Sequence, residues 1–141
     1  MKKIQRSALL MKPAELLYRL VNEVEYYPEF IDGCISTEVL ERSEFEQKAR
    51  LDLSKAGMKV SFTTHNHMVP NERISLDLLD GPFKFMRGEW RFTVLQQNAC
   101  KVEFDIEFDM NSSLLGVAAG KILDSVSSNI VDALCKRANQ L

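Results

Sequence analysis

The chain has 141 residues, of which 45% are hydrophobic and 27% charged, and its formal net charge is −2. This length is typical of one globular domain, residues 1–141, and is long enough to bury a core without disulfides or metal. The near-neutral charge excludes a general polyanion-binding protein and gives no reason to expect DNA as a partner.

The first predicted elements are a strand, a helix and a second strand. Residues 3–11 form a plausible strand, and Pro13 then suits the first turn of a helix. Apolar residues recur at helical spacing through residues 12–24 and predict that helix. Next, residues 25–34 crowd aromatic and apolar side chains into one turn, which either rims an opening or packs against the core. Residues 35–40 form a further plausible strand.

Alternation of apolar and polar residues predicts the remaining strands. The clearest case is residues 100–110, where apolar side chains occupy every second position and Lys, Glu and Asp fill the others. Weaker alternation marks residues 47–54, 58–68, 73–79 and 90–95, separated by turn sequences. A strand with one dry and one wet face is typical of antiparallel sheets. The sequence therefore predicts about seven antiparallel strands.

A long helix is predicted over the C-terminal residues, with Asn111 or Ser112 as its N-cap. Its apolar stripe consists of Leu115, Ala119, Ile122, Val126, Ile130 and Ala133, with Leu123 and Leu134 at the flank. Lys136 and Arg137 lie in the last turns, where they complement the helix dipole. Because the dry face of the sheet must be covered, we expect an α+β helix-grip fold in which a curved antiparallel sheet wraps this helix.

Small residues mark the start of that helix, between Gly116 and Gly120. Each glycine inside a helix costs roughly 0.5–1 kcal/mol relative to alanine, so the pair requires an explanation. Either the helix and sheet approach closely here, or the missing side chains leave an apolar void. The sequence alone does not separate these two interpretations.

The stretch DGPFKFMRGEW, residues 80–90, raises a related question. Pro82 stops strand pairing, and the glycines permit unusual backbone angles. Phe83, Phe85 and Met86 then either fold over an opening between sheet and helix, or simply complete the core.

At these residues the chain resembles the coenzyme Q-binding branch of the START-like superfamily. The matching stretches are ALLMKPAELLYRLVNEVEYYPEFIDGC, LSKAGMKVSFTTHN and LLDGPFKFMRGEWRF. The resemblance implies a hydrophobic cavity under the C-terminal helix and a lipid-like ligand of the ubiquinone or isoprenoid quinone class. Asp32 and Gly33 stand where relatives often have proline and, in quinone chaperones, tryptophan. This difference favours the bacterial, ribosome-associated side of the branch, which implies binding to the large ribosomal subunit and a cognate antitoxin.

We expect the apolar ligand to be held by large side chains of the sheet, the loops and the helix, with no other cofactor. The candidate ligand-binding residues are Phe30, Met58, Phe62, Leu78, Pro82, Phe83, Phe85, Trp90, Phe104, Phe108, Leu115, Ala119 and Ile122. A cavity for such a ligand usually measures roughly 300–1,000 Å³.

Catalytic and metal-binding signatures are scarce. No G-x-S-x-G, P-loop or H-E-x-x-H motif occurs, so we expect no enzyme, and an oligoketide cyclase or aromatase is the alternative function. His65 and His67 share the wet face of one strand, but the sequence offers no obvious third metal ligand.

Binding to the ribosome requires positive charge directed at phosphate. Lys48, Arg50 and Lys59 fall on the wet faces of neighbouring strands, and form either a basic patch or scattered surface charges. A second candidate group consists of Lys84, Arg87 and Arg91.

The expected location is the cytoplasm. Cys34, Cys100 and Cys135 are odd in number and widely separated, which argues against a disulfide framework or a zinc motif and favours free thiols. The basic N-terminus lacks a signal-peptide apolar run, and no transmembrane segment is expected.

Overall fold

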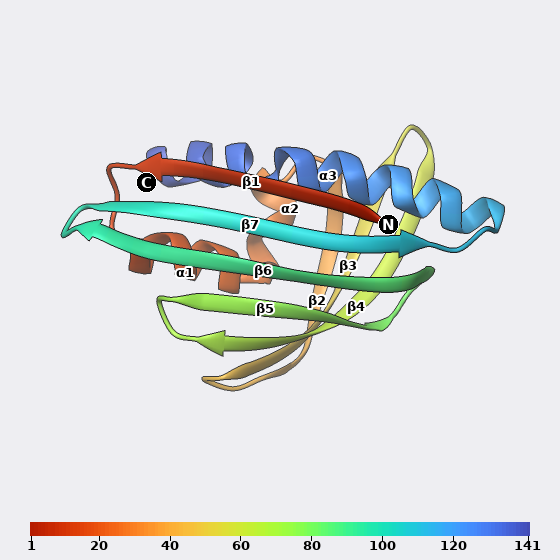
Figure 1. The fold of residues 1–141 in the computed structure, drawn as a ribbon, viewed down its shortest axis with the longest axis horizontal. Helices are drawn as coiled ribbons and strands as arrows, with labels where there is room; N and C mark the ends of the chain where they lie inside the picture. The colour runs from red at the N-terminus through yellow and green to blue at the C-terminus, as the bar shows by residue number, and fades with distance from the viewer.

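The computed structural model describes residues 1–141 and shows a strongly curved sheet that grips a long C-terminal helix (Figure 1). In chain order the elements are β1 (Lys2–Leu10), α1 (Ala14–Asn22), the short 3₁₀ helix η1 (Val24–Tyr26), α2 (Tyr27–Phe30), β2 (Cys34–Arg42), β3 (Glu46–Lys55), β4 (Met58–Val69), β5 (Arg73–Asp80), β6 (Phe83–Gln96), β7 (Ala99–Met110) and α3 (Leu114–Asn139). The seven antiparallel strands, the first helix and the long last helix are therefore confirmed.

The sheet is a meander whose first strand returns to pair with its last. The strand order is β1-β7-β6-β5-β4-β3-β2, and every pairing is antiparallel. In Figure 1, β3 and β4 cross behind β6 and β7 at a steep angle, so the sheet wraps around the side on which α3 lies. α3 packs most extensively against β1 and β7.

One hydrophobic cluster of 33 buried residues fills the space between sheet and helices. The alternation predicted for β7 holds, since Val102, Phe104, Ile106 and Phe108 are all buried. Stacking of Trp90 on Phe104, with ring centroids 4.4 Å apart, joins β6 to β7 in the middle of this cluster. The core therefore lies where the sequence pattern places it.

The start of α3 differs from the prediction. Ser113, rather than Asn111 or Ser112, is the N-cap, and its hydroxyl accepts a hydrogen bond from the Gly116 N–H at 3.1 Å. Leu115 is 54% exposed, so it does not belong to the buried stripe. The buried face instead includes Gly116, Gly120 and Val131.

Gly116 and Gly120 serve close packing, which was one of the two interpretations left open. A Cβ on Gly116 would lie 2.4 Å from the Asn111 carbonyl oxygen, and a Cβ on Gly120 would lie 1.8 Å from the Met110 sulfur. The connection from β7 therefore folds back onto the first turns of α3, into the space that the two glycines leave free.

The stretch at residues 80–90 is mostly strand rather than loop. β6 begins at Phe83, with an irregular register between Phe83 and Phe85. Phe83 is buried and meets Phe62 and Phe108 edge to face, with centroids 6.0 and 6.1 Å away. It therefore completes the core instead of covering an opening. The turn needs Gly81, because a Cβ there would lie 2.7 Å from the Phe62 Cβ.

α3 is also long and apolar enough to cross a membrane by length and composition. Of its most apolar 18-residue window, 44% is buried inside the fold. The same composition is what a helix gripped by a curved sheet requires.

Candidate functional site

A small apolar cavity lies between α3 and the concave face of the sheet. Its volume is about 70 Å³, and 13 of its 16 lining residues are hydrophobic. The lining residues are Val24, Tyr27, Leu51, Leu53, Phe62, Thr64, Asn66, Leu76, Met86, Trp90, Phe104, Ile106, Leu123, Val126, Ser127 and Ile130. The cavity is smaller than the roughly 300–1,000 Å³ usual for small-molecule sites, so a ligand would have to enlarge it.

The cavity carries polar groups that the sequence analysis missed. Thr64 and Asn66 are buried on the inner face of β4, and the Thr64 hydroxyl donates to Asn66 Oδ1 at 2.7 Å. Ser127 faces them from α3 and is 2% exposed. Asn66 takes part in this bond only as the acceptor, and Ser127 takes part in no side-chain hydrogen bond within the protein. The alternation that places Val60 and Phe62 inward, continued by two steps, would have found Thr64 and Asn66.

Tyr27 is the only titratable side chain that lines the cavity. Its hydroxyl donates to the Val21 carbonyl, and burial raises the pKa of Tyr27 well above its ordinary value. Burial, with the charge of Asp52 as a smaller cause, also raises the pKa of the nearby Cys34 thiol to about 11. Both groups therefore stay protonated near neutral pH. What the cavity offers a ligand is apolar contact and hydrogen bonding.

The predicted ligand-binding residues fall into three groups. Phe62, Trp90 and Phe104 line the cavity. Other predicted residues are buried beside it without lining it, namely Phe83, Phe108, Ala119 and Ile122. The rest lie away from it: Phe30, Leu78, Pro82 and Phe85 are partly buried, and Met58 and Leu115 are exposed.

A longer groove runs outside the cavity, between α3 and the turn that joins β3 to β4. It consists of two adjoining hollows of about 460 Å³ each, which share Lys55, Ala56 and Ser125. Phe30 lines one hollow, and Met58 and Ile122 line the other. Three of the predicted residues thus line this outer groove, although Ile122 itself is buried.

The groove carries unpaired positive charge. Lys55, Lys121 and Lys136 line it, none lies within 4.0 Å of a carboxylate, and Asp32 is its only acidic lining residue. Lys55 instead donates to the Ser125 hydroxyl on α3. Next to these lysines the start of α3 exposes Leu114, at 86%. We name this set of lining residues the α3 groove.

The predicted basic patch on the outer face is largely neutralised. Lys48 lies 3.3 Å from Glu41, and Arg50 lies 3.6 Å from Glu38 and 3.5 Å from Asp52. Of the three predicted residues, only Lys59 has no carboxylate within 4.0 Å. Cross-strand pairing of opposite charges, rather than clustering of like charges, governs this face.

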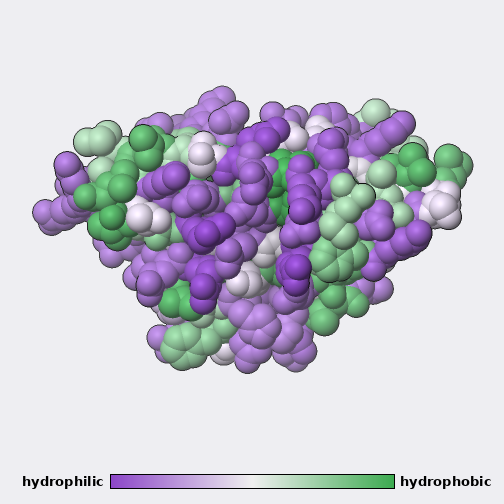
Figure 2. All heavy atoms as spheres, viewed as in Figure 1, coloured by the Kyte–Doolittle hydropathy of each residue, from purple (hydrophilic) through white to green (hydrophobic).

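The second predicted basic group is also divided. Arg91 pairs with Asp105 at 2.7 Å and with Glu89 at 3.2 Å, whereas the Arg87 guanidinium lies over the Phe85 ring at 5.4 Å. Figure 2 shows that hydrophilic side chains dominate the face over β1, β7 and β6, and that hydrophobic side chains gather toward the two ends of the view. This face is polar but of mixed sign.

Comparison with known proteins places these features in context. Residues 10–135 match the protein family described as polyketide cyclase / dehydrase and lipid transport. Ribosome association toxin RatA of Vibrio cholerae is 47% identical over 141 residues, covering 100% of this chain and 98% of that protein. RatA of Escherichia coli K12 is 40% identical, covering 100% and 89%.

Two more distant similarities are to a sequence relative and to a solved structure. The mitochondrial coenzyme Q-binding protein COQ10 homolog B of Xenopus laevis is 23% identical over 131 residues, covering 90% of this chain and 54% of that protein. The crystal structure of the Zhui aromatase/cyclase from Streptomyces sp. R1128 superposes with a TM-score of 0.86 at 18% identity, covering 99% and 94%. At that identity the likeness concerns the fold alone.

Proposed function

Since the chain belongs to the polyketide cyclase/dehydrase and lipid transport family, we propose that it acts by binding, and that its partner is the large ribosomal subunit. The supporting observation is the 47% identity, over the full chain, with a protein named for ribosome association. The proposed location is accordingly the cytoplasm. An antitoxin partner stays a prediction.

We assign the ribosome-binding surface to the α3 groove. Neutralising phosphates with Lys and Arg supplies a large share of affinity for nucleic acid, and a lysine without a carboxylate partner can do this without losing an ion pair. Lys55, Lys121 and Lys136 meet that requirement, whereas Lys48 and Arg50 are held by carboxylates of their own sheet. The exposed apolar residues beside the lysines would add contact area.

Co-sedimentation with isolated large subunits tests this assignment. Reversing the three groove lysines together, Lys55→Glu, Lys121→Glu and Lys136→Glu, should abolish co-sedimentation. The control variant, Lys48→Glu with Arg50→Glu, reverses two charges outside the groove and should leave most binding intact. Binding that survives the groove variant would refute the assignment, and no binding by the wild-type chain would refute the function.

Binding rather than catalysis is supported by the chemistry of the cavity. General acid–base catalysis needs a group that titrates near the working pH, and Tyr27 does not. The resemblance to aromatase/cyclases is one of fold at 18% identity.

A second proposed function is binding of an apolar ligand that has a polar head. Its support is that mostly hydrophobic walls and two side chains able to donate hydrogen bonds, Asn66 and Ser127, line the same cavity. A quinone carbonyl would accept these hydrogen bonds, and each buried methylene of its tail would contribute about 0.8 kcal/mol. Entry would require α3 to move away from the sheet, because the cavity measures only about 70 Å³.

The single tryptophan provides the assay. Trp90 lines the cavity, so a bound quinone should quench its fluorescence in a saturable manner. Val126→Phe fills the cavity and should abolish the quenching. Val117→Phe makes the same change on an exposed position of the same helix and should not. Equal quenching in both variants would contradict this function. So would a wild-type chain that shows no quenching and whose organic extract contains no apolar ligand.

A further inference from the structure

The outer face of the sheet holds a cluster of three side chains that the proposed function does not use. His65 and His67 are the only histidines of the chain, two positions apart on β4. Glu46 is the first residue of β3, and the strand register places it opposite His67. The third side chain that the sequence left unidentified thus comes from the neighbouring strand.

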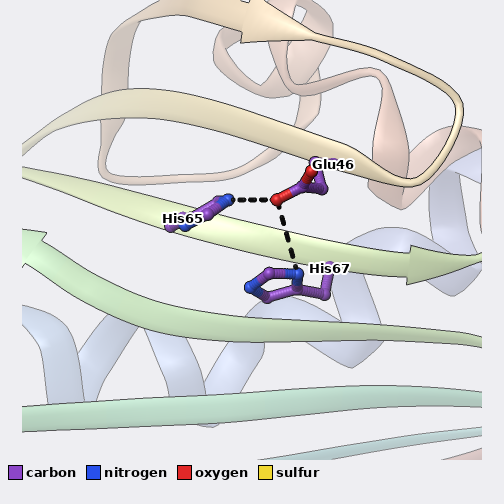
Figure 3. Close-up of side chains that lie close together, drawn as sticks. All are labelled: Glu46, His65 and His67. Carbon is purple, nitrogen blue, oxygen red and sulfur yellow. Dashed lines mark hydrogen bonds and ion pairs between the residues drawn. The ribbon is translucent and has the colours of Figure 1, made fainter.

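The three side chains converge on one point. Figure 3 shows both imidazoles turned toward the Glu46 carboxylate. Glu46 Oε1 lies 2.9 Å from His65 Nε2 and 3.8 Å from His67 Nδ1, and all ligand atoms lie within 4.8 Å of one another. A tetrahedral zinc ion with bonds near 2.1 Å separates its ligand atoms by about 3.4 Å, a value between the two distances from Glu46. Small side-chain rotations would therefore complete a coordination shell.

The surroundings leave room for those rotations. The Glu46 and His67 side chains are 57% and 53% exposed, and the contact between the His67 and His65 rings, with centroids 4.4 Å apart, lies on this open face. A polar hollow of about 330 Å³, lined in part by Glu46 and His65, opens beside them and admits water to the remaining coordination positions. An ion could thus enter directly from solvent.

The local charge also favours a cation. Lys48 lies opposite His65 in the register but is drawn toward Glu41 at 3.3 Å. On the other flank Asp77 of β5 lies opposite His65 and brings a second carboxylate to this face. Arg42, which also lines the hollow, is held by Glu25 at 2.8 Å.

We propose that Glu46, His65 and His67 form a binding site for one divalent transition-metal ion of the zinc class. Two imidazoles and a carboxylate suit Zn²⁺, Ni²⁺ and Cu²⁺, whereas Mg²⁺ and Ca²⁺ prefer all-oxygen shells. With three protein ligands, the fourth position is left to water or to a ligand atom of a partner. Because the ligands come from β3 and β4, a bound ion would tie the two strands together on their outer face.

Calorimetric titration of the isolated, untagged chain with Zn²⁺ tests the site directly. We expect one ion per chain. Glu46→Gln, His65→Gln and His67→Gln should each weaken binding at least about tenfold, since even the loss of outer-shell partners costs 10–100-fold. Glu44→Gln removes the same charge from the same hairpin without touching the cluster, and should bind like the wild type.

Three results would overturn the proposal. If Glu46→Gln bound zinc with wild-type affinity, the carboxylate would not be a ligand and only a pair of histidines would remain. If the wild-type chain gave no heat of binding, the cluster would be an exposed ion pair and not a metal site. Cys135 is the one cysteine that is not buried and could compete for zinc, so the titration is repeated with Cys135→Ser. Loss of binding in that variant would place the ion at the thiol instead. None of these measurements involves ribosomes or quinones, so their outcome is separate from the proposed function.

Discussion

Asp52 is the only charged residue buried in this fold, with 6% of its surface exposed. Its carboxylate accepts hydrogen bonds from Ser36 at 2.5 Å and from Ser61 at 2.6 Å. These two bonds, with a smaller effect of the nearby Arg50 and Lys59 charges, hold the pKa of Asp52 below its ordinary value. One residue thus joins the outer faces of β2, β3 and β4.

The lowered pKa predicts how stability depends on pH. A carboxyl group whose pKa is lower in the folded state stabilises the fold above about pH 3.9, its unfolded value, and loses this contribution as the pH falls through the folded value. We expect Asp52→Asn to reduce the free energy of unfolding at pH 7 by about 1–2 kcal/mol, with the difference shrinking toward zero in acid. Urea denaturation at pH 7 and below pH 4 measures both quantities. Asp80→Asn, an exposed control, should change neither, and a deficit for Asp52→Asn that persists in acid would contradict the linkage.

At the scale of elements, the two glycines of α3 meet different neighbours. The neighbour of Gly116 is the backbone carbonyl of Asn111, which cannot move without shifting the chain. The neighbour of Gly120 is the thioether of Met110, which ends a flexible side chain that is 39% exposed. An added methyl group is therefore expected to destabilise the fold more at position 116 than at position 120.

We predict that Gly116→Ala destabilises the fold by about 1–3 kcal/mol, the usual cost of forcing an extra methyl group into a packed site. Gly120→Ala should cost much less, because Met110 can swing aside and alanine favours the helix by up to about 1 kcal/mol. Thermal or urea unfolding of the two variants provides the comparison. Equal destabilisation would show that the Met110 side chain is as fixed as the Asn111 backbone.

Sequence patterns predicted the elements better than their contacts. Alternation identifies the strands because one face of an antiparallel sheet is wet, and helical spacing identifies α1 and α3. The same patterns assigned Leu115 to the buried stripe, because spacing alone does not show where the sheet ends beside a helix. Phe83 and Phe85 likewise follow a break at Gly81 and Pro82. An irregular register between them, which the sequence does not reveal, leaves only Phe83 fully buried.

At the scale of the whole molecule, the net charge is −2, so the positions of the unpaired cations determine where the protein can bind RNA phosphates. The sequence suggested Lys48, Arg50 and Lys59, since it shows which residues share a face but not which carboxylates reach them. Only the fold brings Lys55 of β3 beside Lys121 and Lys136 of α3. The polar part of the cavity could not be predicted from the sequence for the same reason, because Ser127 and Asn66 are far apart in the chain and only the fold brings them together.

Salt should reveal how many phosphates the α3 groove contacts. Each phosphate neutralised by a lysine contributes about −0.7 to −0.9 to the slope of log affinity against log salt concentration, so three lysines predict a slope of about −2 to −3. Filter binding or co-sedimentation over a range of KCl concentrations measures it. Single reversal of Lys121 should make the slope shallower by about one phosphate's share. A slope near zero would mean that apolar contacts, not these lysines, hold the complex.

The pairing of β1 with β7 has a consequence for how the chain is made. Lys2 lies opposite Phe108, so β1 is synthesised about 100 residues before β7, the strand with which it pairs. At 5–20 residues per second that delay lasts roughly 5–20 s. The hairpins from β2 to β7 can close in the order of synthesis, whereas β1 stays single and β7 emerges with a bare edge, the kind of edge that recruits other chains. During synthesis, aggregation is therefore most favoured just before β1 pairs with the exposed edge of β7.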